Sequence, residues 1–317
     1  MEATARHDAD TDLARRGPEA YAAEFIGTLM LVFFIGAIVS LNSADGLGFT
    51  DWSVIGLLHF LLLTMLVYTV GHASGAHFNP AVTVTLAALR KIAPVDAAIY
   101  VVLQIVGAIA GAFLVKVLLL DEGDAAGYGA TKISDAFLDG KALSGFLAEL
   151  IGTFALMWAI MGVAVNPRGA RDWAGIVIGG TLGFAVMTIG PLTGAGLNPA
   201  RALGPSIAGG GESIDTFIVA YTLGPIVGAL LAGVLYTALI LAPEGRGSGR
   251  RPVDTLSGAA ESPRGGDLDP VRGGDVESPR GRDVELPTGI DRPATSPPPA
   301  KPGGGYGSTD VNPKPDE

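Results

Sequence analysis

The sequence predicts an all-α membrane protein in which six transmembrane helices and two re-entrant half-helices form an inverted repeat. Three observations lead to this fold class. Of the 317 residues, 49% are hydrophobic and 16% are charged, and the apolar residues gather in six long segments. Two copies of Asn-Pro-Ala, at 79–81 and 198–200, each open a short run of helix-compatible residues. The two halves of the chain also share further motifs at matching positions.

The six predicted spans follow from length and polarity. Each is close to the roughly 20 residues needed to cross a hydrocarbon core about 30 Å thick. The alternative, a soluble protein with six buried helices, would show charged helix faces, and these segments have none. The spans are residues 20–41, 53–71, 96–119, 143–165, 173–190 and 215–242.

Polar segments flank this membrane domain, which we place at 20–242. Residues 1–19 are predicted to be a cytoplasmic N-terminal segment. Residues 243–317 are rich in Gly, Pro, Ser, Asp and Arg and are predicted to be a disordered cytoplasmic tail, because they cannot bury a core.

The distribution of Lys and Arg predicts the orientation. Basic residues near the cytoplasmic ends of spans outnumber those at the other side in most membrane proteins. We therefore expect a multi-pass protein of the cell (plasma) membrane with both termini in the cytoplasm. One side of the membrane carries Arg15, Arg16, Arg90, Lys91, Arg168, Arg171, Arg246, Arg250 and Arg251, and the other carries Lys116, Lys132 and Lys141.

Internal repetition explains how the spans are organised. Ala-Glu-x-x-Gly-Thr occurs at 23–28 and 148–153, and residues 71–81 align with 190–200. Repeat 1 covers about 20–119 and repeat 2 about 143–242. Because each contains three spans, the second copy must be inverted relative to the first, which commonly places a shared site near the bilayer midplane.

The two Asn-Pro-Ala triplets predict the N-termini of the half-helices. Asn is a favoured N-cap, and Pro at the first helical position loses no needed hydrogen bond. The triplets are Asn79-Pro80-Ala81 and Asn198-Pro199-Ala200, the second followed by Arg201. Glycines spaced four apart, such as Gly107 with Gly111 and Gly224 with Gly228, are expected where helices approach closely.

This combination of motifs resembles the aquaporin, or major intrinsic protein, family over about residues 20–242. The resemblance implies a homotetramer in which each protomer has a pore for water or small neutral solutes. It implies that Asn79 and Asn198 meet near the midplane, where their amides donate to a passing water. The positive helix ends would exclude cations and protons there.

The resemblance also assigns roles to the loops before the triplets. Glu24 and Glu149 are expected to brace these loops, in preference to acting as a proton relay. The loops are expected to run extended and to line the pore with a ladder of carbonyl groups. The residues assigned to this ladder are Gly75, Ala76, His77, Phe78, Gly194, Gly196 and Leu197.

The resemblance also implies a selectivity filter of four residues, which are found by counting back from the triplets. It comprises His59, Val186, Ala195 and Arg201. The first two are more like plant tonoplast members of the family than typical water-selective members, although His59 could instead be a packing residue. Ala202 and Ser206 stand where glycerol conductors usually carry Asp and a base, which favours water.

Other functions receive less support. A broader pore for ammonia, urea or glycerol remains an alternative, and a secondary transporter or an adhesion-like structural protein is less favoured. We expect no enzyme activity and no cofactor. A metal site at His72 and His77 would need more ligands, and cysteine is absent from the sequence. The net charge of −10 argues against nucleic acid as a partner.

Overall fold

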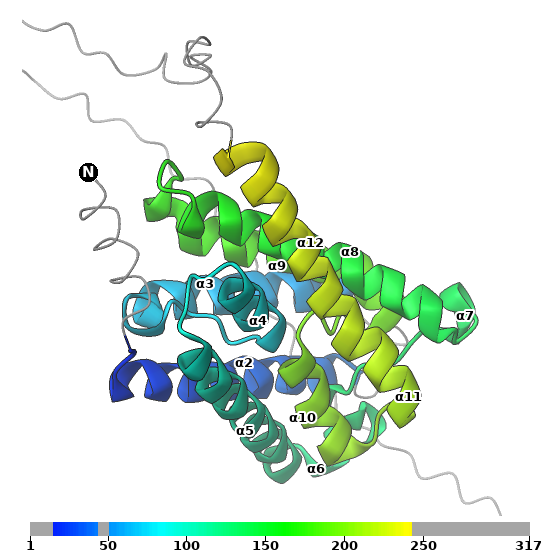
Figure 1. Cartoon of the computed structure of the whole chain (residues 1–317). Coiled ribbons are helices and arrows are strands. Elements are labelled where there is room, and N and C mark those ends of the chain that lie inside the picture. The colour runs from blue at the N-terminus through cyan, green and yellow to red at the C-terminus, as the bar shows by residue number, and fades with distance from the viewer. Residues whose placement is uncertain (1–14, 44–50, 243–317) are drawn as a thin grey trace, which may run out of the picture. The chain divides into compact units, whose positions relative to one another are not determined.

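Six long apolar helices form the body of the protein, and two short helices lie among them (Figure 1). The computed structural model describes residues 15–43 and 51–242, and no strand occurs within these ranges. The tail predicted at 243–317 lies outside the described residues. The all-helical membrane fold predicted from the sequence is confirmed.

The six spans lie close to the predicted segments. They are Pro18–Ser43 (α2), Trp52–Ser74 (α3), Pro94–Leu118 (α5), Ala142–Val165 (α8 with η2), Arg171–Thr193 (η3 with α9) and Ile214–Leu241 (α11, η4, α12 and η5). The two short helices are α4, Pro80–Ala88, and α10, Pro199–Gly209. Between the halves run α6 at Leu120–Ala125, η1 at Gly127–Gly129 and α7 at Asp135–Leu138.

The last span is not a regular α-helix throughout. It starts with one short turn, α11 (Ile214–Thr216), widens into a π-helical segment, η4 (Phe217–Leu223), and becomes α12 (Gly224–Tyr236). Pro225 stands at the start of α12 and has no backbone N–H to continue the hydrogen-bond ladder. A local change to the wider π-helical hydrogen-bond pattern is one way for a helix to accommodate a missing backbone bond.

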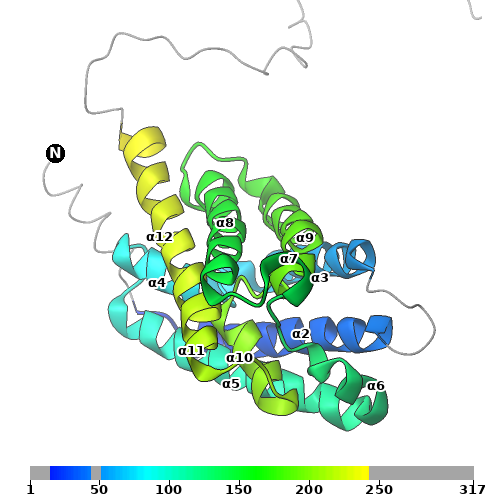
Figure 2. The same cartoon turned by 90° about the vertical axis from the view of Figure 1, so that its right-hand side faces the viewer.

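The helices pair in corresponding ways in the two halves. Helix α2 packs on α5, α8 (Ala142–Ile160) packs on α12, and α3 packs on α9 (Ala174–Thr193) across the halves. Figures 1 and 2 show α2 and α5 side by side in both views. Each half therefore contributes an equivalent helix pair, as an inverted repeat requires.

Glycines set how closely these helices approach. A Cβ on Gly107 or Gly111 of α5 would lie 2.5 Å from a backbone oxygen of α2. A Cβ on Gly228 of α12 would lie 2.2 Å from the Leu150 oxygen of α8. The predicted use of these glycines in close helix packing is confirmed.

We expect Gly179→Ala to destabilise the protein, whereas its neighbour Gly180 should tolerate alanine. A Cβ at Gly179 would meet the Phe60 carbonyl oxygen at 2.6 Å, but one at Gly180 would find its nearest neighbour at 3.7 Å. Overpacking of this kind costs about 1–3 kcal/mol. Thermal unfolding of both variants in detergent measures the difference. Equal midpoints for the two would contradict the packing described for α3 and α9.

Candidate functional site

The N-termini of α4 and α10 are capped by the two triplet asparagines. The Asn79 side chain accepts a hydrogen bond from the Ala81 N–H, and Asn198 accepts from the N–H groups of Ala200 and Arg201. Both asparagines have extended backbones, and a proline follows each as the first helical residue. The local sequence therefore produces the helix starts that it predicts.

The two short helices enter the protein from opposite ends. Helix α4 leads within a few residues to Pro94, where α5 begins. The far end of α10 lies at the other end of α5, because Lys116 donates from its Nζ to the Ala208 carbonyl at 2.6 Å. Since α5 runs the length of a span, the C-termini of α4 and α10 lie on opposite sides and their N-termini point inward.

Reciprocal hydrogen bonds join the two N-termini. The Asn79 Nδ2 donates to the Leu197 carbonyl at 2.9 Å, and the Asn198 Nδ2 donates to the Phe78 carbonyl at 2.7 Å. Each side-chain amide has two N–H groups. One N–H of each asparagine therefore holds the opposite loop, and the other N–H remains available to a molecule in the adjacent cavity.

The loops before the triplets are not extended, which corrects the sequence-based expectation. Three of the four residues before each asparagine have a left-handed backbone with positive φ. This conformation alternates the direction of successive peptide groups, and it costs about 1–2 kcal/mol at a residue with a Cβ. The values are 90°, 52° and 49° at Gly75, Ala76 and Phe78, and 78°, 47° and 51° at Gly194, Ala195 and Leu197.

Glu24 holds the first of these loops. Its carboxylate oxygens accept from the N–H groups of His77 at 2.9 Å and Phe78 at 2.7 Å. The side chain of Gln104 donates to the same carboxylate at 2.7 Å and to the Thr83 hydroxyl at 3.0 Å. Hydrogen bonds to a charged group contribute about 1.5–3 kcal/mol each, which is enough to offset the left-handed residues.

Glu149 holds the second loop in the corresponding way. It is completely buried and accepts from the N–H groups of Gly196 and Leu197. The Thr193 hydroxyl donates to the same carboxylate. Both glutamates thus have loop donors around their oxygens, which is the geometry of a loop brace.

Two buried tyrosines complete the support of the loops. The Tyr100 hydroxyl donates to the Ser74 carbonyl at 2.9 Å, and the Tyr221 hydroxyl donates to the Thr193 carbonyl at 2.8 Å. These carbonyls belong to the last residues of α3 and α9. Sequence reasoning assigned no such role to Tyr100 or Gln104. A polar residue within an apolar span was the signal that could have identified both.

A narrow cavity of about 40 Å³ lies beside the joined helix ends. At roughly 10–15 Å³ for each water, it holds a short file of about three. Apolar side chains line one part of it, namely Leu31, Ile35, Leu63, Val82, Leu156, Ile160, Ile178 and Leu182. The remainder comes from Ala76, His77, Phe78, Ala195, Gly196 and Leu197 of the loops, and from His59, Asn79, Asn198 and Arg201.

His59 presents an unpaired nitrogen in this lining. Its Nδ1 lies 2.7 Å from the Ile55 carbonyl, which can only accept, so Nδ1 carries the proton. In the neutral ring, Nε2 is then a hydrogen-bond acceptor, and it is buried with no hydrogen-bond partner among the described residues. The side chain therefore offers one acceptor to a molecule in the cavity.

Arg201 contributes the fixed positive charge. It is 3% exposed, and its Nη1 donates to the Gly129 carbonyl at 2.9 Å. Its Nε is buried and has no hydrogen-bond partner within residues 15–43 and 51–242. The carbonyl of Gly129 belongs to the turn η1, so the connection between the two halves positions this guanidinium.

The other two predicted filter residues differ in position. Ala195 lines the narrow cavity, and its small side chain leaves room there. Val186 is 1% exposed and packs in the surrounding apolar cluster, and it is not among the residues lining that cavity. The structure thus brings His59, Ala195 and Arg201 to one cavity and places Val186 in the packing beside it.

A wider cavity of about 760 Å³ adjoins the narrow one. It includes both histidines considered for a metal site, His72 and His77. No group of three or more potential metal ligands is found in residues 15–43 and 51–242. His77 also lies 3.1 Å from the Thr83 hydroxyl through its Nδ1.

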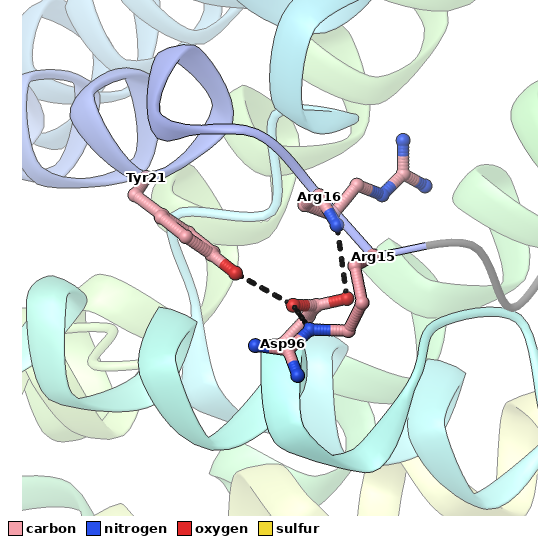
Figure 3. A network of polar contacts seen from close by, with 4 residues as sticks. All are labelled: Arg15, Arg16, Tyr21 and Asp96. Atoms are coloured by element: carbon pink, nitrogen blue, oxygen red, sulfur yellow. Dashed lines mark hydrogen bonds and ion pairs between the residues drawn. The ribbon is translucent and has the colours of Figure 1, made fainter.

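A buried carboxylate that sequence reasoning did not consider ties the N-terminal segment to α5. Asp96 accepts from the Arg15 Nε at 3.1 Å, the Arg16 N–H at 3.1 Å and the Tyr21 hydroxyl at 2.7 Å (Figure 3). Its position in the first turn of α5, after Pro94, is a favourable one for an acid. That position was the signal for it in the sequence.

Two opposed half-helices beside a narrow polar cavity, inside a six-span inverted repeat, define a membrane channel. The chain belongs to the major intrinsic protein family, because the sequence model of that family matches residues 16–236. This is a family of aquaporin channels rather than enzymes, and its members move water and small solutes across lipid membranes.

Several relatives are similar over most of their length. "Probable aquaporin AqpM" of Archaeoglobus fulgidus is 39% identical over 241 residues, which are 69% of this chain and 96% of the relative. "Nodulin-26" of Glycine max is 39% identical over an alignment that covers 68% of this chain and 75% of the relative. "Glycerol uptake facilitator protein-like 6" of Lactiplantibacillus plantarum is 41% identical over an alignment that covers 67% of this chain and 94% of the relative.

A solved structure supports the fold. The aquaglyceroporin of Plasmodium falciparum aligns with a TM-score of 0.59 and 24% sequence identity. The alignment covers 71% of this chain and 97% of that one.

We expect Glu24→Gln to reduce the folded yield and the thermal stability of the protein. An amide keeps one acceptor oxygen but places an NH2 group where the other carboxylate oxygen accepts from either His77 or Phe78. The buried donors that then face each other are left unsatisfied, at a cost of about 1–3 kcal/mol. Size-exclusion profiles and melting in detergent measure the effect. Glu19→Gln in the exposed first turn of α2 is the control. A Glu24→Gln melt equal to that of the control would contradict the loop-bracing role.

Proposed function

We propose that this protein is a passive transmembrane water channel that excludes protons and ions. The observation that carries this proposal is the narrow cavity, which is apolar on one part and polar where Asn79, Asn198 and the two loops line it. Polar groups replace part of the hydration that a water loses on entry, and apolar groups keep it from binding too tightly.

The two asparagines carry the central step of conduction. Each amide has one N–H engaged with the opposite loop, so the second can donate to the oxygen of a passing water. Donation from both sides turns that oxygen toward the asparagines and its hydrogens toward the neighbouring waters. A water held in this orientation cannot accept a proton from its neighbour, which interrupts proton transfer along the file.

Electrostatics exclude cations at the same place. The N-terminus of a helix carries roughly half a positive charge before screening, and two N-termini meet here. Arg201 adds a full charge in the cavity lining. The carbonyls of the loops then serve as acceptors for water, with those of Phe78 and Leu197 shared with the asparagine amides.

A second candidate is a broader pore for ammonia, urea or glycerol. The small side chain of Ala195 in the cavity lining favours it. The names of two similar proteins, a glycerol uptake facilitator-like protein and an aquaglyceroporin, also support it. A secondary transporter receives less support, because the intramembrane carboxylates of Glu24 and Glu149 are engaged with loop donors.

We further propose a homotetramer in the cell (plasma) membrane with cytoplasmic termini. The distribution of Lys and Arg supports this orientation. Between 33% and 56% of an 18-residue apolar stretch in each span is buried within one protomer, which leaves apolar surface for lipid and for neighbouring protomers. Each protomer carries its own pore.

We expect proteoliposomes containing the protein to shrink faster than empty liposomes after an osmotic step, with a lower activation energy. Stopped-flow light scattering measures both quantities. Equal water permeability in the two preparations would overturn the channel proposal. Uptake that depends on a proton or sodium gradient would favour a transporter.

A cysteine substitution provides the matched control for that measurement. The sequence contains no cysteine, so mercurials should leave the unmodified channel open. Ala195→Cys introduces a thiol into the narrow cavity, and a mercurial should then block water flow reversibly. Ser213→Cys, at an exposed residue outside the cavity, should remain insensitive.

We expect Val186→His to narrow the pore and to lower solute flux relative to water flux. An imidazole is larger than the valine side chain, and Val186 belongs to the same buried apolar cluster as Ala195, so we expect the added volume to displace the cavity lining. Urea, glycerol and ammonia gradients across proteoliposomes measure the ratio. Val177→His, on the exposed face of α9, is the control. Solute flux that is present and unchanged in Val186→His would refute the assignment of Val186 to the filter.

A further inference from the structure

Among the described residues, the wide cavity at the end of the protein near Arg16 is lined by bases and by no carboxylate. Its charged side chains are Arg16, Lys91 and Arg171, and its histidines are His72 and His77. Neither Asp nor Glu of residues 15–43 and 51–242 is part of this lining. A concave surface lined by one sign of charge focuses its field and concentrates ions of the opposite sign. The cavity is therefore an attractive site for an anion.

The three bases are free of partners within the described part of the chain. No hydrogen bond or ion pair joins the side chains of Arg16, Lys91 and Arg171 to other described residues. Asp96 binds Arg16 through its backbone N–H alone. Figure 3 shows the Arg16 guanidinium pointing away from that carboxylate. Asp96 thus fixes the position of Arg16 without occupying its charged group.

The wide cavity leads directly to the narrow one. The two share Ala76, His77, Val82, Ile160 and Ile178 in their linings. A water that leaves the narrow cavity on the side of these shared residues enters the wide one. An occupant held by the three bases would therefore lie across the path of conduction.

We propose that the wide cavity binds an anion of the phosphate class and that the bound anion hinders water flow. Two guanidinium groups can each hold phosphate oxygens in bidentate fashion, and the lysine adds a point charge. With a volume of about 760 Å³, the cavity is large enough for a multivalent anion. A halide offers one charge and no set of oxygens, so it gains much less from the same groups.

The binding follows from the cavity alone, whereas its effect on flow rests on the proposed function. Two measurements separate these parts. Isothermal titration calorimetry of the full chain in detergent, with sodium pyrophosphate as the probe, reports binding whether or not the protein conducts. Stopped-flow permeability of proteoliposomes with pyrophosphate on both faces reports the effect on flow. Sodium chloride of equal ionic strength is the reference in both.

We expect pyrophosphate to bind saturably and to lower water permeability toward that of empty vesicles. The double variant Lys91→Gln/Arg171→Gln should bind it about tenfold more weakly or worse, a change of roughly 1.4 kcal/mol. Its permeability without pyrophosphate serves as its own baseline. Arg90→Gln is the matched control, because Arg90 is an exposed neighbour of Lys91 that does not line the cavity.

Vesicle composition identifies the natural source of the phosphate group. Inhibition by pyrophosphate in zwitterionic phosphatidylcholine vesicles supports a soluble anion. Lower permeability in phosphatidylglycerol vesicles without pyrophosphate, relieved in the double variant, supports a lipid headgroup.

Three results would overturn the proposal. The first is calorimetry that shows no binding beyond that of chloride. The second is equal binding by the double variant and Arg90→Gln. The third is saturable binding with unchanged water flow in a conducting channel, which would refute the hindrance. A protein that binds pyrophosphate as expected but conducts no water would refute the proposed function instead.

Discussion

The structure depends on satisfying the backbone polar groups of two broken helices at membrane depth. A loop exposes N–H groups that an apolar environment cannot solvate, and each unsatisfied group is costly. Glu24 and Glu149 supply charged acceptors for these donors, one at each loop. With their N–H groups held, the loops can adopt left-handed conformations, and their carbonyls are free to face the cavity or the opposite asparagine. Burying two carboxylates costs free energy, but without them the loops could not form a polar path through an apolar protein.

The same arrangement explains why the two halves depend on each other. Each asparagine caps its own half-helix through its side-chain oxygen and holds the other loop through its nitrogen. Neither half can present its helix N-terminus correctly without the partner half. The inverted repeat is thus completed at a single contact, and the narrow cavity lies beside it. Arg201 breaks the symmetry, because Val82 occupies the corresponding position of the first half.

The two ends of the conduction path differ in character. At one end, Arg201 is buried and is held by a carbonyl of the segment that connects the halves. At the other, Arg16, Lys91 and Arg171 surround a wide cavity with their charged groups unengaged by the described residues. Both ends repel cations, but only the wide one has the room and the donors to hold a multivalent anion. The proposed filter at one end and the proposed anion site at the other therefore differ in their chemistry.

The sequence by itself determined the six spans, the repeat, both helix caps and the bracing glutamates, because each rests on local chemistry or on length. It did not determine the loop conformation, for which it indicated extended chain, since the left-handed residues depend on a carboxylate from another helix. The roles of Tyr100, Gln104 and Asp96 were likewise decided by the tertiary structure, which brings their partners from distant segments. The tertiary structure also decided that Val186 lies behind the cavity lining. Counting residues along a chain gives a position in sequence, whereas the direction of a side chain follows from how the helices pack.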